Sequence, residues 1–247
     1  MINISFDKLD VGPYTEEMLQ KQWPGVTNIK GVKEGRCCIA DIDGERALQV
    51  TFVKGKLGPT DGGVSWRYRF EKSFDEFTVE FKVMMSKDFI YKRGGKLPGL
   101  CGGTNPRGGT ANISADKGFS ARIMWRELGA LEQYVYFANQ DSKKKYGTDL
   151  YWKKEDRTPA CMFPGIWYTF KSYIKMNTPG KNDGKIISWL DDYEVLNEDI
   201  ALRNDSSLGV DSFQFVTYFG GNDETWYPEK DEKIYFKDFR FMGAKLP

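Results

Sequence analysis

Phe119-Ser-Ala-Arg-Ile-Met-Trp125 and Leu131-Glu-Gln-Tyr-Val-Tyr-Phe137 are the two stretches that alternate most clearly between core-type and polar residues. Successive side chains of a β-strand point to opposite faces of its sheet. The first stretch therefore buries one face and presents the other, which carries Ser120, Arg122 and Met124. In the second stretch Gln133 joins the buried face, and the opposite face carries Glu132, Tyr134 and Tyr136.

Only residues 127–130 separate these stretches, so we predict that they form an antiparallel hairpin. The hairpin would gather Ser120, Arg122, Tyr134 and Tyr136 on one surface. Two interpretations of this surface are open. It is either a structural ladder in which Tyr and Arg side chains pack on a solvated sheet, or a functional site.

The rest of the chain favours an all-β fold. Short alternating segments, separated by clusters of Gly, Pro, Asn and Asp, predict nine strands. Such a series is typical of a two-sheet sandwich or jelly roll, and we expect one domain over residues 1–247. Residues 15–22 predict a helix with Thr15 as its N-cap, and a hairpin-like connection is expected between residues 176 and 185. The strands are predicted at residues 47–52, 64–70, 78–84, 119–125, 131–139, 167–176, 185–190, 213–219 and 233–242.

Composition excludes several classes of partner. Lys and Arg total 36 against 35 Asp and Glu, so no global field attracts nucleic acid or an anionic membrane. The first eight residues do not resemble a signal peptide, and no stretch is apolar enough to span a membrane. We expect a soluble monomer, with its compartment left open. The four cysteines lack the spacing of a zinc site, and we expect buried or partly buried thiols at Cys37, Cys38, Cys101 and Cys161.

The chain contains no histidine. That removes the commonest general base and every Ser-His or Cys-His hydrolase. Chemistry must then fall to Lys, Arg, Tyr, Asp or Glu. One candidate is Lys96, which lies in a glycine-rich stretch, residues 93–103, that reads as part strand and part loop. Residues 102–118 are rich in Gly, Asn and Thr and predict a mobile loop over a groove.

These residue types suit elimination across C4–C5 of a uronate. The reaction needs a neutralised carboxylate, a base for the C5 proton and an acid for the leaving oxygen. Arg122 and Lys96 suit the first role, because fixed cations favour the enolate-like transition state. Tyr134 or Tyr136 suits the other two, and we expect the nearby cations to lower the pKa of the base. A neutral-to-alkaline pH optimum follows.

Several strings in the sequence resemble polysaccharide lyase family fourteen, whose members include alginate and polyglucuronate lyases of algal viruses and molluscs. Fungal glucuronan lyases of family twenty are similar, and the viral members come nearest in length and style. The resemblance rests on Gly94-Gly-Lys-Leu-Pro-Gly-Leu100 with Gly102-Gly103, on Ser120-x-Arg122 and Tyr134-x-Tyr136, and on Lys175-Met-Asn-Thr-Pro-Gly180 with Asp183-Gly184 and Trp189.

The resemblance implies a β-jelly roll of two curved antiparallel sheets, with a concave groove that binds a polyuronate and no required metal or cofactor. The family's essential lysine, serine, arginine and tyrosine pair correspond to Lys96, Ser120, Arg122, Tyr134 and Tyr136. Ser120 would orient the substrate or its carboxylate. The order of the two tyrosines as base and acid stays open, with Tyr136 preferred as the base.

Two other functions remain as alternatives. A β-glucanase-like hydrolase needs paired carboxylates on one strand face, and the nearest pair is Glu127 and Glu132 across a turn. A non-catalytic carbohydrate-binding module would bind sugars by aromatic stacking, with platforms drawn from Trp66, Tyr68, Trp167, Tyr173 and Trp226, some of which the alternation assigns to the core.

Overall fold

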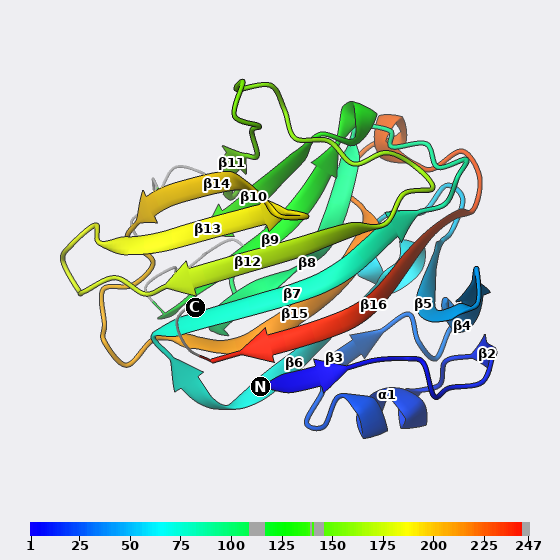
Figure 1. Cartoon of the computed structure of the whole chain (residues 1–247), viewed down its shortest axis with the longest axis horizontal. Helices are drawn as coiled ribbons and strands as arrows, with labels where there is room; N and C mark the ends of the chain where they lie inside the picture. The colour runs from blue at the N-terminus through cyan, green and yellow to red at the C-terminus, as the bar shows by residue number, and fades with distance from the viewer. Residues whose placement is uncertain (109–116, 139, 141–145, 244–247) are drawn as a thin grey trace.

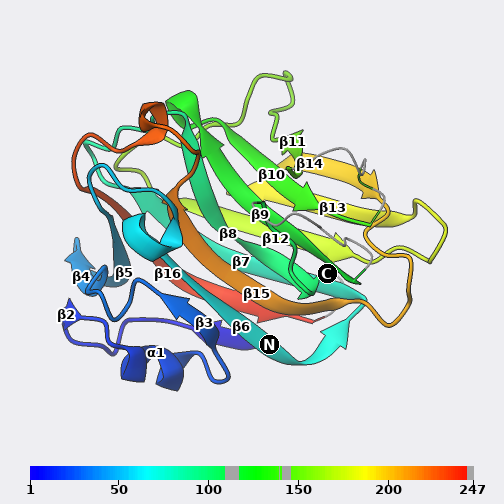
Figure 2. The ribbon, with the colours of Figure 1, turned by 180° about the vertical axis from the view of Figure 1, so that it is seen from behind.

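Two antiparallel β-sheets pack face to face in the computed structural model, which describes residues 1–108, 117–138, 140 and 146–243. The sheet nearer the viewer in Figure 1 has nine strands, and the sheet behind it, seen from the front in Figure 2, has seven. Both are visibly curved, and the predicted all-β jelly-roll class is confirmed.

The nine-stranded sheet has the order β14-β13-β12-β7-β16-β5-β4-β2, and β1 pairs with β16. Its strands are β1 (Ile2–Ile4), β2 (Gly12–Pro13), β4 (Cys37–Ile42), β5 (Glu45–Phe52), β7 (Glu76–Met85), β12 (Tyr168–Lys175), β13 (Gly184–Leu190), β14 (Tyr193–Ile200) and β16 (Glu232–Met242).

The seven-stranded sheet has the order β11-β10-β9-β8-β15-β6-β3. Its strands are β3 (Thr27–Lys30), β6 (Val64–Phe74), β8 (Gly94–Gly103), β9 (Gly118–Arg126), β10 (Leu131–Tyr136), β11 (Thr148–Tyr151) and β15 (Val210–Phe219). Short helical turns lie at Gly58–Gly62, Glu127–Gly129 and Glu224–Trp226.

Each of the nine predicted strands coincides with an observed one. The strand predicted over residues 131–139 is too long, because β10 ends at Tyr136, and Asn139 lies outside the described residues. Prediction missed seven strands, which are β1, β2, β3, β4, β8, β11 and β14. Most are short or carry exposed polar residues, as at the sheet margin β14, so they lack a clear apolar alternation.

The α-helix α1 (Glu16–Gln22) confirms the predicted helix and its cap. The Thr15 side chain accepts a hydrogen bond from the Met18 amide at 3.2 Å, which satisfies one of the free N–H groups of the first turn. The predicted hairpin connection also holds, because β12 pairs with β13 up to Lys175 and Lys185.

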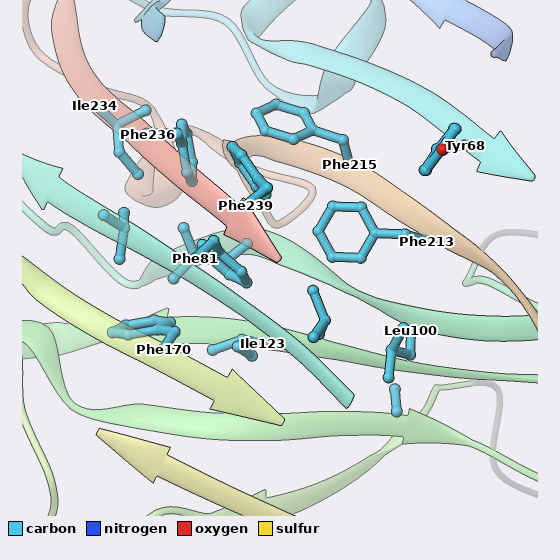
Figure 3. Packing of buried hydrophobic residues seen from close by; sticks show 14 of the residues in the cluster. Tyr68, Phe81, Leu100, Ile123, Phe170, Phe213, Phe215, Ile234, Phe236 and Phe239 are labelled. Carbon is cyan, nitrogen blue, oxygen red and sulfur yellow. The ribbon is translucent and has the colours of Figure 1, made fainter. Parts of the chain in front are cut away.

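Aromatic side chains fill the space between the sheets. Trp66 stacks on Phe215 with ring centroids 3.9 Å apart, and Phe81 stacks on Phe239 at 5.4 Å. Figure 3 shows Phe81, Phe170 and Ile123 meeting there from strands of both sheets. Tight apolar packing fixes how the two sheets lie, and so leaves the outer face of the seven-stranded sheet available for a site.

Gln133 is the one polar side chain of the hairpin that points into this core. Its amide nitrogen donates to the Ala121 carbonyl at 2.7 Å, and its oxygen accepts from the Ser188 hydroxyl of the other sheet at 3.0 Å. The amide is thus paired on both sides, as a buried polar group requires. The bond between the sheets helps to fix β10 in position below the site.

All four cysteines are free thiols; Cys37 and Cys101 are buried, and Cys38 and Cys161 are partly buried. No helix in the part of the chain that the structure describes has the length and apolar character needed to cross a membrane.

Candidate active site

The predicted hairpin is present, and its register determines the site. β9 and β10 pair so that Arg122 lies opposite Tyr134 and Ser120 lies opposite Tyr136. β8 adds Lys96 on the other side of β9, opposite Met124. The five residues predicted from the sequence therefore share one face of three adjacent strands.

These pairings form three parallel rows across the outer face of the seven-stranded sheet. The first row runs from Tyr218 through Lys96, Met124 and Glu132 to Tyr151, the second from Gln214 through Gly99, Arg122 and Tyr134 to Asp149, and the third from Ser212 through Cys101 and Ser120 to Tyr136. Neighbouring strands lie about 4.8 Å apart, so side chains in one row are in contact range.

A cavity of about 620 Å³ opens over these rows. Four of the five predicted residues line it: Lys96, Arg122, Tyr134 and Tyr136. Its other lining side chains are Arg107, Met124, Arg126, Tyr146, Asp149, Tyr218, Asn222 and Trp226.

Ser120 does not reach the cavity. Its side chain is fully buried, and its hydroxyl donates to the carbonyl of Pro106 at 2.8 Å. Pro106 belongs to the segment that follows β8, and its neighbours Arg107 and Gly108 line the cavity. In this geometry Ser120 holds the covering segment on the sheet.

That segment is the described part of the loop predicted over residues 102–118. Its ends belong to strands, because β8 runs to Gly103 and β9 begins at Gly118. The Asn105 amide donates to the Gln214 side chain at 2.7 Å, which fixes the loop across the outer face. Residues 109–116 of the predicted loop lie outside the described residues.

The two tyrosines form a contacting pair. Their rings meet edge to face with centroids 5.4 Å apart, and their hydroxyls lie 3.3 Å from each other. The Tyr134 hydroxyl also accepts a hydrogen bond from the Gly147 amide at 2.9 Å. Both side chains are largely buried, but they lie on the outer face with Met124, apart from the main core between the sheets.

Burial raises the pKa of the Tyr134 hydroxyl above its usual value near 10, and the bond to Tyr136 adds to the rise. The expectation that nearby cations lower this pKa is therefore wrong for Tyr134. Desolvation of the phenolate outweighs the attraction of Arg122. Tyr134 keeps its proton at neutral pH and suits an acid better than a base.

Lys96 shows the opposite behaviour. Its amine lies over the Tyr134 ring, 3.4 Å from the centroid, and contacts the sulfur of Met124. Burial, followed by repulsion from Arg122 and Arg126, lowers its pKa well below the usual value near 10.4. The ammonium form is therefore disfavoured, and Lys96 is a poorer fixed cation than the sequence suggested. A neutral amine in this position can accept a proton.

Arg122 remains the charged group of the floor. It is only 4% exposed, and its guanidinium carbon lies 5.7 Å from the Tyr136 ring centroid. Its Nε has no hydrogen-bond partner, and none of the ion pairs among the described residues involves it. A buried guanidinium without a counter-ion favours binding of an anion, and its planar donors match a carboxylate.

Arg126 and Asp149 belong to the site but were missed by sequence reasoning. Arg126 is the last residue of β9, in phase with Arg122 and Met124, so strand alternation could have included it. Asp149 lies on the short edge strand β11, which has no clear sequence signal. Arg126 contacts Glu132 at 2.7 Å and Asp149 at 3.0 Å.

The carboxylate pair that a hydrolase would need is not in place. Glu127 is exposed in the turn after β9, whereas Glu132 is fully buried and paired with Arg126, so the two carboxylates do not face one substrate. Trp66 and Tyr68 are core residues. Of the proposed aromatic platforms, Trp226 lines the cavity.

No group of three or more His, Cys, Asp or Glu side chains in the described ranges is arranged to hold a metal ion. The charged residues that line the cavity are lysine and arginine together with Asp149, and Asp149 is paired with Arg126. The groups that line the cavity and could take part in chemistry therefore include the Lys96 amine, the Arg122 guanidinium and the phenols of Tyr134, Tyr136, Tyr146 and Tyr218.

The fold and the site together define a jelly-roll, carbohydrate-active protein whose groove suits an acidic sugar chain. The family model described as polysaccharide lyase 14 matches residues 40–239. The chain belongs to polysaccharide lyase family 14, and it is an enzyme of the lyase class.

Solved structures of alginate lyases share the fold of this chain. The alginate lyase Aly36B is 24% identical, with 100% of this chain and 98% of that chain covered and a TM-score of 0.84. The alginate lyase of Aplysia kurodai is 23% identical, with 98% of each chain covered and a TM-score of 0.80. The alginate lyase vAL-1 from Chlorella virus is 24% identical, with 96% of this chain and 99% of that chain covered and a TM-score of 0.73. The viral enzyme is thus no nearer in fold than the mollusc enzyme. No curated protein sequence matches the chain.

Proposed function

We propose that this chain is a single catalytic domain that cleaves a polyuronate by β-elimination in the cavity over β8, β9 and β10. The observation that carries the proposal is Arg122, a buried guanidinium without a carboxylate partner among the described residues, beside one amine and two phenols. A uronate supplies the missing anion on the carbon next to the bond that breaks.

The roles follow from the protonation of each group. Arg122 binds the C5 carboxylate and stabilises the charge that grows on it as the C5 proton leaves. The neutral Lys96 amine takes that proton, and electrons of the C5–H bond form the C4–C5 double bond as the C4–O4 bond breaks. The tyrosine pair returns a proton to the departing O4, which becomes the new end of the other fragment.

Lys96 replaces a tyrosine as the base in this scheme for a physical reason. Burial raises the pKa of Tyr134 and lowers that of Lys96, so the amine gives up its proton more readily than a free lysine does, whereas the phenol holds its proton. Ser120 is a positioning residue, because its hydroxyl holds Pro106 and with it the segment that covers the cavity.

An anionic polysaccharide fits the charges of the groove, since none of the ion pairs among the described residues involves Arg122, and Arg107 also lines the cavity. Related proteins point the same way, because a variant of Aly36B has a structure in complex with an alginate tetrasaccharide. We propose alginate-type or glucuronan-type chains as substrates of this enzyme.

Incubation with alginate, polymannuronate, polyguluronate and glucuronan tests the proposal. Cleavage is followed by the ultraviolet absorbance of the conjugated double bond at the new chain ends. We expect turnover on at least one of these polymers, a loss of about 10²–10⁴-fold in kcat for Lys96→Ala, and no change for Lys21→Ala on the exposed side of α1. Full activity of Lys96→Ala would reject the role of Lys96, and reducing ends without the new absorbance would indicate hydrolysis.

A further inference from the structure

Glu132 is a fully buried carboxylate beside the proposed active site that the elimination itself does not use. It lies in the row that contains Lys96, with only Met124 of β9 between the two residues. Both side chains extend from the same face of the sheet, because residues directly opposite one another in a ladder share a face. A buried charge at this point costs stability, so its presence calls for a reason.

The Arg126 guanidinium offsets part of the cost of burying the Glu132 carboxylate. Arg126 lies 2.7 Å from the Glu132 carboxylate and 3.0 Å from Asp149, and it also lines the cavity. Arg126 is thus shared by two carboxylates. The charge of one guanidinium does not balance both of them, and the surplus negative charge lies beside Lys96. Asp149 is about one-third exposed, whereas Glu132 has no contact with solvent. The field of Glu132 is therefore the less screened of the two.

The charged and titratable groups around Glu132 come from every strand that packs against it. β8 contributes Lys96, β9 contributes Arg122 and Arg126, β10 contributes Tyr134, and β11 contributes Asp149 and Tyr151. The two arginines disfavour a proton on Lys96, and the two carboxylates favour it. The charge on the Lys96 amine is thus a balance between them.

We propose that Glu132 is a positioning residue that sets the protonation of Lys96 and thereby the pH range in which the enzyme works. The inference rests on the proposed function, in which Lys96 must be neutral to accept the C5 proton. The ionised carboxylate stabilises the ammonium form, which keeps the amine basic enough to take a carbon-bound proton. Without it, Arg122 and Arg126 would leave Lys96 neutral but weakly basic.

Glu132 itself titrates in the relevant range. Burial raises the pKa of its carboxyl to about 7, although Arg126 opposes the rise. As pH falls through this value, Glu132 gains a proton and the support for the Lys96 ammonium disappears. The two groups therefore share their protons as a coupled pair, and each responds to the charge of the other.

Glu132→Gln tests the proposal, because it removes the charge and keeps the shape. We expect the acidic limb of kcat/KM to move to lower pH by on the order of one pH unit, as expected for charges two strand spacings, or about 10 Å, apart at an effective dielectric near 20. The matched variant Asp149→Asn removes the more exposed carboxylate from the same arginine and should shift the limb less. A limb that does not move in Glu132→Gln would overturn the proposal.

Titration of the Lys96 side chain by ¹⁵N NMR separates this inference from the proposed function, because it needs no turnover. The Lys96 midpoint should fall in Glu132→Gln even if no polyuronate is cleaved. If Glu132→Gln does not fold, the wild-type Lys96 resonance should show a second inflection near pH 7 that reports Glu132. A single inflection, or equal midpoints in variant and wild type, would contradict the coupling.

Discussion

The Tyr134 hydroxyl lies 3.3 Å from the Tyr136 hydroxyl, on the same side of the sheet as the Lys96 amine, which contacts the Tyr134 ring. This contact links the proposed acid and base through one side chain. Burial holds the proton on Tyr134 and disfavours it on Lys96. One desolvated environment thus prepares both groups for opposite roles, since burial always favours the uncharged form.

The tyrosine pair should behave as a unit. We expect Tyr134→Phe and Tyr136→Phe each to lower kcat by about 10²–10⁴-fold, the range for loss of a general acid, with KM less affected. The double variant should lose little more than the worse single variant, because groups that act together are not additive. Steady-state rates of double-bond formation measure this. Wild-type rates in both single variants would remove the tyrosines from the reaction.

The pH dependence of kcat/KM should show activity from neutral to alkaline pH. The base must be uncharged, so activity falls as pH drops through the lowered pKa of Lys96, well below the usual 10.4 or so. The acid must be protonated, and the raised pKa of Tyr134 keeps the alkaline limb at or above about 10. A profile with its maximum in the acidic range would contradict both assignments.

Lys96 should lower stability while it supports activity. The unfolded lysine keeps its proton to higher pH than the folded one, so wild-type stability rises with pH between the two pKa values. At neutral pH we expect Lys96→Met to abolish turnover and raise Tm by about 2–4 °C, or roughly 1 kcal/mol in a chain of this size. Calorimetry measures the Tm of Lys96→Met and of the control Lys21→Met on α1. The control should have the Tm of the wild type.

Arg122 is the predicted anchor of the substrate carboxylate. Arg122→Lys keeps a charge but loses the planar pair of donors, so we expect kcat/KM to fall by about 10²–10³-fold, as for loss of a transition-state donor. Arg36→Lys is the matched control, because Arg36 donates to the backbone carbonyls of Gly63 and Thr60. This variant should keep the wild-type kcat. An unchanged kcat/KM in Arg122→Lys would argue against carboxylate binding at this position.

Gly99 lets β8 approach β9 closely enough to place Lys96 beside Arg122. A Cβ at Gly99 would lie 2.1 Å from the Ala121 carbonyl oxygen. Gly99→Ala should therefore destabilise the fold by about 1–3 kcal/mol through overpacking, measured by urea unfolding. At Gly220 the nearest atoms are 3.8 Å away, so Gly220→Ala should be tolerated. Equal stabilities would show that the strands can separate at no cost.

Much of the site could be predicted from local sequence because it depends on strand alternation. The short connection between β9 and β10 fixed their pairing, and pairing placed Arg122 beside Tyr134. Lys96 was a candidate from its residue type, but its position beside the hairpin was harder to predict, because its glycine-rich strand has no apolar alternation. The role expected for Ser120 differs from its position, since its hydroxyl turns to Pro106.

The pKa values could not be predicted from the sequence. They depend on how completely the covering segment and β11 exclude water, and on which charges remain unpaired after folding. The sequence suggested cations that lower the pKa of a tyrosine, whereas the tertiary structure buries Tyr134 and raises it. Asp149 affects Lys96 because β11 pairs with β10 at one register, and Arg126 affects it because β9 pairs with β8.

The amino-acid sequence by itself determined the all-β class, the hairpin and the face on which the tyrosines and Arg122 lie, because these follow from the two-residue period of a strand and from short connections. Only the tertiary structure decided which of these side chains reach the cavity, which carboxylates remain beside Lys96, and which groups hold protons. Those properties arise from desolvation and from contacts between residues far apart in the chain, and local sequence patterns carry neither.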